Sequence, residues 1–203
     1  MNNIAPAELV PTAPGTPFQG GFYAGRFRVH DEVFALIVSP KAGGELADQA
    51  WAGINVDVPG TESFCDGLGN TLAMAEGDST LAKAITALDI NGFTDWYLPS
   101  RDELELLYRN LKPTTQQNYT HRHGENPSSL PAGYPYTPAL PVQTPAPDFH
   151  DGGVQAFAGE WYWSSTQFSR YYAWDQYFSD GNQVFNDKSF EGPARAVRRF
   201  KVQ

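Results

Sequence analysis

Residues 95–108 read DWYLPSRDELELLY, and this segment predicts the best-defined helix of the chain. Ser100 and Glu103 form a capping box, in which the serine hydroxyl and the glutamate carboxylate each accept a backbone N–H at the start of the helix. Apolar side chains then recur at helical spacing and form one buried stripe: Leu104, Leu107 and Tyr108. The segment therefore predicts a helix that begins directly after Ser100 and packs against a core.

The residues before this helix predict a β-hairpin and a second helix. Residues 22–29 are aromatic and partly alternating, residues 30–32 are a polar turn, and residues 33–38 are apolar throughout. An unbroken apolar run is typical of a strand that is buried on both faces. Apolar positions at helical spacing predict a helix over residues 81–88, capped by Asp78 or Ser79 and ended by Asn91-Gly92.

Between the hairpin and the second helix, the glycines indicate loops: Gly60, Gly67, Gly69 and Gly77. A short strand formed by Trp51 and residues 54–56 is expected there.

The residues after the capped helix predict a long loop and then a sheet. Residues 113–147 hold eight of the sixteen prolines, so residues 113–157 are expected to be an irregular loop that lies against the domain or a partner. Alternating and aromatic segments then predict strands, with a hairpin turn at residues 179–182 and the last strand closing the same sheet: 160–166, 171–178, 183–187 and 194–200.

Length and charge limit the class of protein. The chain has 203 residues, with 14 Lys and Arg against 23 Asp and Glu, which gives a net charge of −9. An acidic surface repels phosphate backbones and anionic lipid, so we expect neither nucleic-acid binding nor membrane insertion. The lone Cys65 excludes an intramolecular disulfide and is expected to be a small buried side chain. Four prolines predict that residues 1–20 are an extended arm and that residues 21–203 form one domain.

Aromatic residues are concentrated near the C-terminus, where ten of the 28 lie within residues 157–178. Strand alternation sends neighbouring rings to opposite faces, so both sets are buried only if something covers the second face of the sheet. Trp163 and Trp174 are expected in the core. The remaining positions are candidates for a ligand-binding surface: Tyr171, Tyr172, Tyr177, Trp161, Gln176 and Asn182.

Metal sites and a basic cluster are the other candidates. His121, His123 and His150 are possible metal ligands but are expected to be solvated loop residues. Possible oxygen ligands for calcium are spaced along the last hairpin, at Asp180, Asn182, Asn186 and Asp187. The Asp-Gly-Asn sequence there is also that of an ordinary hairpin turn. No cofactor is therefore expected, and a calcium ion is the alternative. The basic residues near the C-terminus are expected to form salt bridges, with contact to an anionic glycan as the alternative: Arg195, Arg198, Arg199 and Lys201.

Two motifs in this order resemble the Lcl C-terminal domain family. They are the DWxLPS segment at residues 95–100 and the YWSST segment at residues 162–166, followed by Tyr172-Ala173-Trp174 and by Arg195-Ala196-Val197-Arg198. The resemblance runs from about residue 22 to residue 200. It implies an α+β, C-type-lectin-like fold with small antiparallel sheets, two helices and a long irregular loop region.

The resemblance also implies a function in binding, since members look like adhesins or bacteriophage receptor-binding proteins. The Glu-Pro-Asn and Trp-Asn-Asp motifs of calcium-dependent lectins are absent as such, because this chain has Glu125-Asn126-Pro127 and Trp174-Asp175 instead. Formylglycine-generating enzymes share the implied fold and use active-site cysteines, which a lone Cys65 does not supply. Residues 1–8 lack the basic and apolar segments of a secretory signal peptide, so we expect synthesis in a host cytoplasm.

We therefore expect a non-enzymatic virion protein of a bacteriophage tail fibre, tip or baseplate. Its expected partners are other virion proteins and a host-surface receptor, either a glycan or a protein, and a homo-oligomer, a trimer first, is expected. A structural virion protein, such as a capsid decoration or tail-assembly subunit, is the alternative, with the aromatic surface as a subunit contact. An enzyme of the formylglycine-generating type is a third hypothesis.

Overall fold

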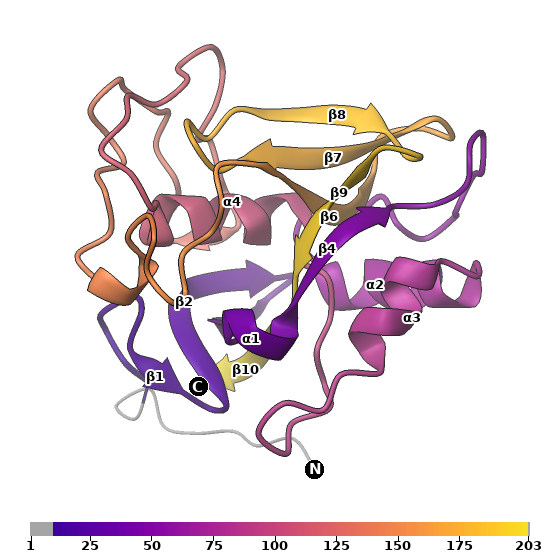
Figure 1. The fold of residues 1–203 in the computed structure, drawn as a ribbon, viewed down its shortest axis with the longest axis horizontal. Coiled ribbons are helices and arrows are strands. Elements are labelled where there is room, and N and C mark those ends of the chain that lie inside the picture. The colour runs from indigo at the N-terminus through magenta and orange to yellow at the C-terminus, as the bar shows by residue number, and fades with distance from the viewer. Residues whose placement is uncertain (1–9, 203) are drawn as a thin grey trace.

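A computed structural model describes residues 10–202, which form an α+β fold of three small antiparallel sheets and four helices (Figure 1). The first sheet has the order β1-β2-β3-β10, with β5 added to β2. Its strands are β1 (Pro17–Phe18), β2 (Gly21–Val29), β3 (Glu32–Val38), β5 (Ser129–Leu130) and β10 (Val197–Val202). The predicted hairpin is confirmed, and the core of β3 is buried on both faces.

Two further antiparallel sheets complete the fold. One pairs β4 (Glu45–Ala50) with β9 (Glu191–Arg195), and the other has the order β6-β7-β8. Its strands are β6 (Trp161–Gln167), β7 (Tyr172–Tyr177) and β8 (Gln183–Asp187). No helix within the described residues 10–202 is long and apolar enough to cross a membrane.

The prediction that residues 194–200 close the same sheet as residues 183–187 is wrong. Ala196 separates β9 from β10, and its N–H donates to the Gly44 carbonyl. The chain passes there from the β4–β9 sheet into the first sheet, where Val197 pairs with Val38. The alternation of residues 194–200 is compatible with either sheet, because a strand pattern specifies faces and not the neighbouring strand.

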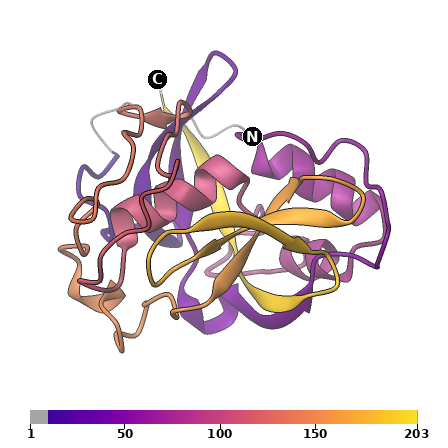
Figure 2. The ribbon, with the colours of Figure 1, turned by 90° about the horizontal axis from the view of Figure 1, so that it is seen from above.

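The capped helix α4 (Arg101–Leu111) lies between the first sheet and the β6–β7–β8 sheet (Figure 2). Both halves of the predicted capping box are present, and Leu104, Leu107 and Tyr108 are buried. Together with the buried faces of β2 and β3, this stripe forms the largest apolar core.

The carboxylate of Glu103 joins three segments. It accepts hydrogen bonds from the Tyr97 hydroxyl (2.6 Å), the Ser100 N–H (2.7 Å) and the Gly67 N–H (3.1 Å). Burial raises the pKa of Glu103 to about 7 because it disfavours the charged form, and these donors recover part of that cost.

Gly67 shows why the prediction of a loop at residues 67–77 is wrong. Helix α2 (Gly67–Glu76) occupies this stretch and is capped by the Asp66 side chain, which accepts from the Gly69 N–H at 3.0 Å. A Cβ at Gly67 would lie 2.2 Å from Oε2 of Glu103. The glycine is therefore required by the close approach of α2 to the start of α4 and does not mark a loop.

Helix α3 (Thr80–Thr86) confirms the second predicted helix, with Ser79 as the cap, although it ends several residues before Asn91-Gly92. The predicted strand of Trp51 and residues 54–56 is not formed. Trp51 is fully buried against α3, and its indole N–H donates to the Ser164 carbonyl at 2.8 Å. The strand of this region is β4, before Trp51.

The β4–β9 sheet explains how both faces of β6 are buried. Tyr162 faces the core around α4, whereas Trp163 points the other way and is also fully buried. Strand β9 packs against β6, and the Trp163 indole N–H donates to the Gln49 carbonyl at the end of β4 (2.8 Å). The prediction of Trp163 as a core residue is confirmed.

The prediction of an extended arm is wrong for residues 10–20. Val10 is 4% exposed and belongs to an apolar cluster with Tyr23, Ile37 and Phe200 on the outer face of the first sheet. Strand β1 also pairs with β2. An apolar outer face needs a cover, and this segment supplies it. The remainder of the predicted arm, residues 1–9, lies outside the described residues.

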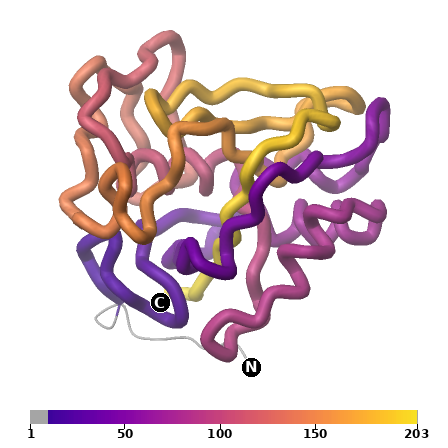
Figure 3. The backbone as a smooth tube through the Cα atoms, viewed as in Figure 1, coloured from indigo at the N-terminus to yellow at the C-terminus, as the bar shows by residue number. Residues whose placement is uncertain are grey.

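The proline-rich loop is irregular, as predicted, except for strand β5 and one short 3₁₀ helix (Pro147–Phe149). It folds back along α4 (Figure 3). Asn118 fixes it there, because its amide donates to the Thr137 carbonyl (3.1 Å) and the Pro141 carbonyl (3.0 Å) while its oxygen accepts from the Tyr108 hydroxyl (2.7 Å).

We predict that Glu103→Ala lowers the free energy of unfolding by about 2 kcal/mol. Alanine has no acceptor, so the Tyr97 hydroxyl and the N–H groups of Ser100 and Gly67 lose the carboxylate that they share. Urea unfolding followed by tryptophan fluorescence measures the change. Glu76→Ala, at the exposed end of α2, is the matched control and is expected to change stability by less than about 0.5 kcal/mol. Equal stabilities of the two variants would contradict the role of Glu103.

Candidate ligand-binding surface

Partly exposed aromatic rings gather where β7 and β8 meet the loop before α2. Phe168 and Phe185 stack in parallel, with centroids 3.9 Å apart, and Trp174 meets both rings edge-on. Phe64 lies 6.0 Å from Trp174, and Tyr172 lies 5.6 Å from Phe185. These five residues are called the aromatic platform.

Strand pairing places most of the aromatic platform. Trp174 pairs directly with Phe185 across β7 and β8, and Tyr172 shares their face two residues along. The four rings other than Trp174 are between 40% and 49% exposed. Contiguous exposed aromatic surface of this kind marks interaction sites in soluble proteins.

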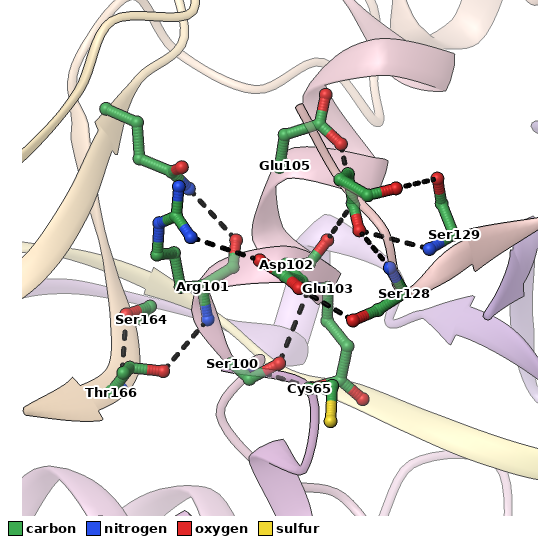
Figure 4. Close-up of polar contacts among 12 residues, drawn as sticks. Cys65, Ser100, Arg101, Asp102, Glu103, Glu105, Ser128, Ser129, Ser164 and Thr166 are labelled. Atoms are coloured by element: carbon green, nitrogen blue, oxygen red, sulfur yellow. Dashed lines mark hydrogen bonds and ion pairs between the residues drawn. The ribbon is translucent and has the colours of Figure 1, made fainter. Parts of the chain in front are cut away.

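Arg101 adds a cation to the aromatic platform. Its guanidinium carbon lies 4.6 Å from the Phe64 centroid and 4.9 Å from the Trp174 centroid. Its backbone is fixed on both sides, because its N–H donates to the Thr166 hydroxyl (3.0 Å) and its carbonyl accepts from the Gln183 amide (2.9 Å) (Figure 4). The cation is therefore held in place by α4 and by the β6–β7–β8 sheet together.

Two N–H groups at the aromatic platform lack acceptors within residues 10–202: Nε of Arg101 and Nε1 of Trp174. Both of these nitrogens are buried, so a ligand on the surface reaches the partly exposed end of the Arg101 guanidinium and not these two atoms. The surface therefore suits a ligand that combines apolar faces with oxygen acceptors.

The structure brings two of the six predicted site residues to this surface. Tyr172 belongs to the aromatic platform, and Tyr171 lies at its edge, 6.3 Å from Tyr172. Trp161 and Tyr177 stack on each other at 5.0 Å on the opposite face of the strands, and each is half-buried. Asn182 lies in the β7–β8 turn.

Two predictions about individual residues are wrong. Gln176 is fully buried, and its amide donates to the Gly181 carbonyl (3.2 Å), so it is not accessible to a ligand. It shares its face with Tyr162, which turns this end of β7 toward the core. Trp174, expected in the core, is only half-buried, because α4 begins at Arg101 and leaves the end of that face uncovered.

Sequence reasoning missed the adjacent Arg101 and four of the five residues of the aromatic platform: Phe64, Phe168, Trp174 and Phe185. Phe185 was within reach, because the hairpin turn at residues 179–182 pairs it with Trp174. Phe64 and Arg101 come from distant segments, and no periodicity in the sequence connects them to β7.

Three of the candidate metal ligands are engaged in other contacts. His123 accepts from the Gln183 N–H at 3.2 Å, and burial lowers its pKa. His150 contacts the Thr144 carbonyl at 2.8 Å, and Asn186 donates to Asp175. Across residues 10–202, no three His, Cys, Asp or Glu side chains are grouped so as to hold a metal ion.

The basic residues near the C-terminus form salt bridges, as predicted. Arg195 pairs with Glu45, Arg198 with Asp95, Arg199 with Asp66 and Lys201 with Glu32. Cys65 is half-buried rather than buried. Desolvation raises the pKa of its thiol, which is opposite to the shift that activates a cysteine nucleophile.

The family follows from a comparison with known proteins. The family model of the Lcl C-terminal domain matches residues 61–198, which is more than half of the chain. The chain therefore belongs to the Lcl C-terminal domain family. The match contains the whole aromatic platform and excludes the β2–β3 hairpin, so it is shorter than the resemblance seen in the sequence. No curated protein matches the chain.

Asp175, next to Trp174 on β7, makes the stability of the fold depend on pH. It is fully buried, its Oδ1 has no partner within the described chain, and burial raises its pKa from 3.8 to about 7. The folded state therefore binds this proton more tightly than the unfolded state does. Its contribution to stability is greatest at low pH and falls as pH rises from about 4 through about 7.

We predict that Asp175→Asn raises the free energy of unfolding by about 2 kcal/mol at pH 8, because no buried charge remains. The gain over the wild-type protein is expected to disappear toward pH 4. Urea titrations at both pH values measure it, and the exposed Asp148→Asn is the control. A difference that does not depend on pH would contradict the assignment.

Proposed function

We propose that this protein is a non-enzymatic binding protein with a C-type-lectin-like fold. Support comes from the topology: β10 at the C-terminal end pairs with β3 of the N-terminal hairpin, and a second sheet and a long loop are inserted between them. A closed base of this kind holds the inserted segments in place, so that they can present a binding surface.

The aromatic platform is the proposed binding surface, and its exposed rings beside Arg101 are the observation that carries the proposal. Sugar rings have C–H faces that pack on aromatic rings, and their hydroxyl oxygens accept hydrogen bonds. The rings provide the apolar contact, and the Arg101 guanidinium, whose side chain is 22% exposed, provides the donors. A host-surface glycan is therefore the proposed ligand, with a host-surface protein as the alternative receptor.

The proposed setting is a bacteriophage tail fibre, tip or baseplate. This part of the proposal rests on the resemblance to the Lcl C-terminal domain family, because members of that family look like adhesins and phage receptor-binding proteins. Other virion proteins are then partners, and a trimer is the proposed assembly.

A structural virion protein is the second candidate, and the same exposed rings favour it. In a capsid decoration or tail-assembly subunit, the aromatic platform would be buried against a neighbouring subunit. The two candidates differ in whether the purified protein binds a glycan.

We predict that the purified protein binds a subset of glycans on an array of bacterial surface polysaccharides. Phe185→Ser and Phe168→Ser are expected to weaken binding by at least about tenfold, because each removes one of the two stacked rings. Val154→Ser, which removes an exposed apolar side chain outside the aromatic platform, is the control and should retain wild-type binding. Circular dichroism checks that each variant is folded.

Absence of binding to any polysaccharide would contradict the glycan-receptor proposal. If Phe185→Ser also converted an oligomer into a monomer in analytical ultracentrifugation, the result would favour the structural alternative.

A further inference from the structure

A second cavity lies apart from the aromatic platform, between the C-terminal half of α4 and the proline-rich loop. It is a groove of about 230 Å³ whose walls include Leu106, Arg109, Leu130, Tyr134, Leu140 and Val142. Its loop side is apolar, and Val142 alone is 62% exposed. The groove therefore offers a small apolar volume with one cation in its wall.

Arg109 is held in the wall by its other nitrogens. Its Nε donates to the Glu105 carboxylate at 2.9 Å, and its Nη2 donates to the carbonyls of Gly124 and Tyr134. Its side chain is only 8% exposed. Nη1 has no acceptor within the described part of the chain, so two of the five guanidinium N–H groups are unpaired.

One carboxylate near the groove, that of Glu105, already pairs with Arg109, so an incoming anion would bind at the unpaired Nη1 and not at an uncompensated charge. The Glu105 carboxylate already accepts from Arg109, from the Tyr136 hydroxyl (2.7 Å) and from the Asn126 amide (2.6 Å). The ammonium group of Lys112 donates to the Pro141 carbonyl. Its other two hydrogen bonds also go to uncharged oxygens, those of Gln116 and Asn118. Residues 126–147 contain no charged side chain, so nothing on the loop repels a carboxylate.

We propose that this groove binds a small apolar carboxylic acid, with the carboxylate at Nη1 of Arg109 and the apolar part against Leu130, Leu140 and Val142. A hydrogen bond between a guanidinium and a carboxylate is roughly twice as strong as one between neutral groups. The ring of Tyr134 lies 4.5 Å from the guanidinium carbon, and its hydroxyl bonds to nothing among residues 10–202. This ring is the side chain that moves to admit the carboxylate.

The test compares N-acetyl-L-leucine with N-acetyl-L-leucinamide, which have nearly the same shape and differ in charge. Each is titrated into the full chain at pH 7 while ¹H–¹⁵N spectra are recorded. The acid is expected to shift the amide signals of residues 130–142 and to bind at least about tenfold more tightly than the amide. Equal binding of both probes, no binding of the acid, or shifts confined to other regions would overturn the proposal.

Two substitutions at an exposed position provide a matched pair. Val142→Asp places a negative charge in the groove and is expected to weaken binding of the acid at least about tenfold. Val142→Asn has nearly the same size without the charge and is expected to keep the affinity within about threefold. Equal effects of the two variants would contradict recognition of a carboxylate.

Arg109→Lys tests the guanidinium itself. It keeps the positive charge but removes the N–H groups of Nη1, so weaker binding of the acid is expected together with unchanged binding of the amide. A variant that keeps full affinity for the acid would overturn the assignment to Nη1. Urea unfolding establishes that the variant is folded, and the Val142 pair tests the same proposal if it is not.

Discussion

One buried carboxylate, that of Glu103, sets the geometry on which the rest of the fold depends. It is shared by the segment before α4, by the first turn of α4 and by the first residue of α2. The constraint works in both directions, because Gly67 must lack a side chain for the carboxylate to fit. The helix that this contact fixes begins at Arg101, the cation of the aromatic platform. A contact in the interior thus determines where the surface cation stands.

The distribution of aromatic residues follows from how the three sheets are layered. Tyr162 is buried by α4 on one face of β6, and Trp163 is buried by β4 and β9 on the other. The cover given by α4 ends where the helix begins, and the rings beyond that point stay partly exposed. The aromatic platform is therefore the uncovered end of a face that is otherwise core, which explains why its rings already stack on one another.

Local patterns in the sequence predicted the local structure well. The capping box, the hairpin at residues 22–38, the helix capped by Ser79, and the strands of the last sheet are formed by residues close in sequence, so spacing alone identifies them. The predictions are wrong where the structure of a segment depends on a residue that is distant in the sequence. Gly67 indicates a loop when the sequence is considered alone, because the Glu103 carboxylate that lies against it comes from a distant segment. Residues 194–200 form one alternating stretch in the sequence, but in the structure they are divided between β9 and β10, which belong to two different sheets. The binding surface was predicted only in part for the same reason, since Phe64 and Arg101 reach β7 from elsewhere in the chain.

The pairing of β3 with β10 has a mechanical consequence. The chain enters the first sheet at Pro17, whose partner Phe22 pairs with Val38, and leaves it at Val202, beside Val33, so the two points of attachment lie at opposite ends of the sheet. Tension applied through the two ends of the domain therefore loads the β2–β3 and β3–β10 hydrogen bonds in shear, all at once, instead of opening them one after another. Because resistance to force is governed by the rate of unfolding, this arrangement is expected to slow the unfolding of the domain under tension.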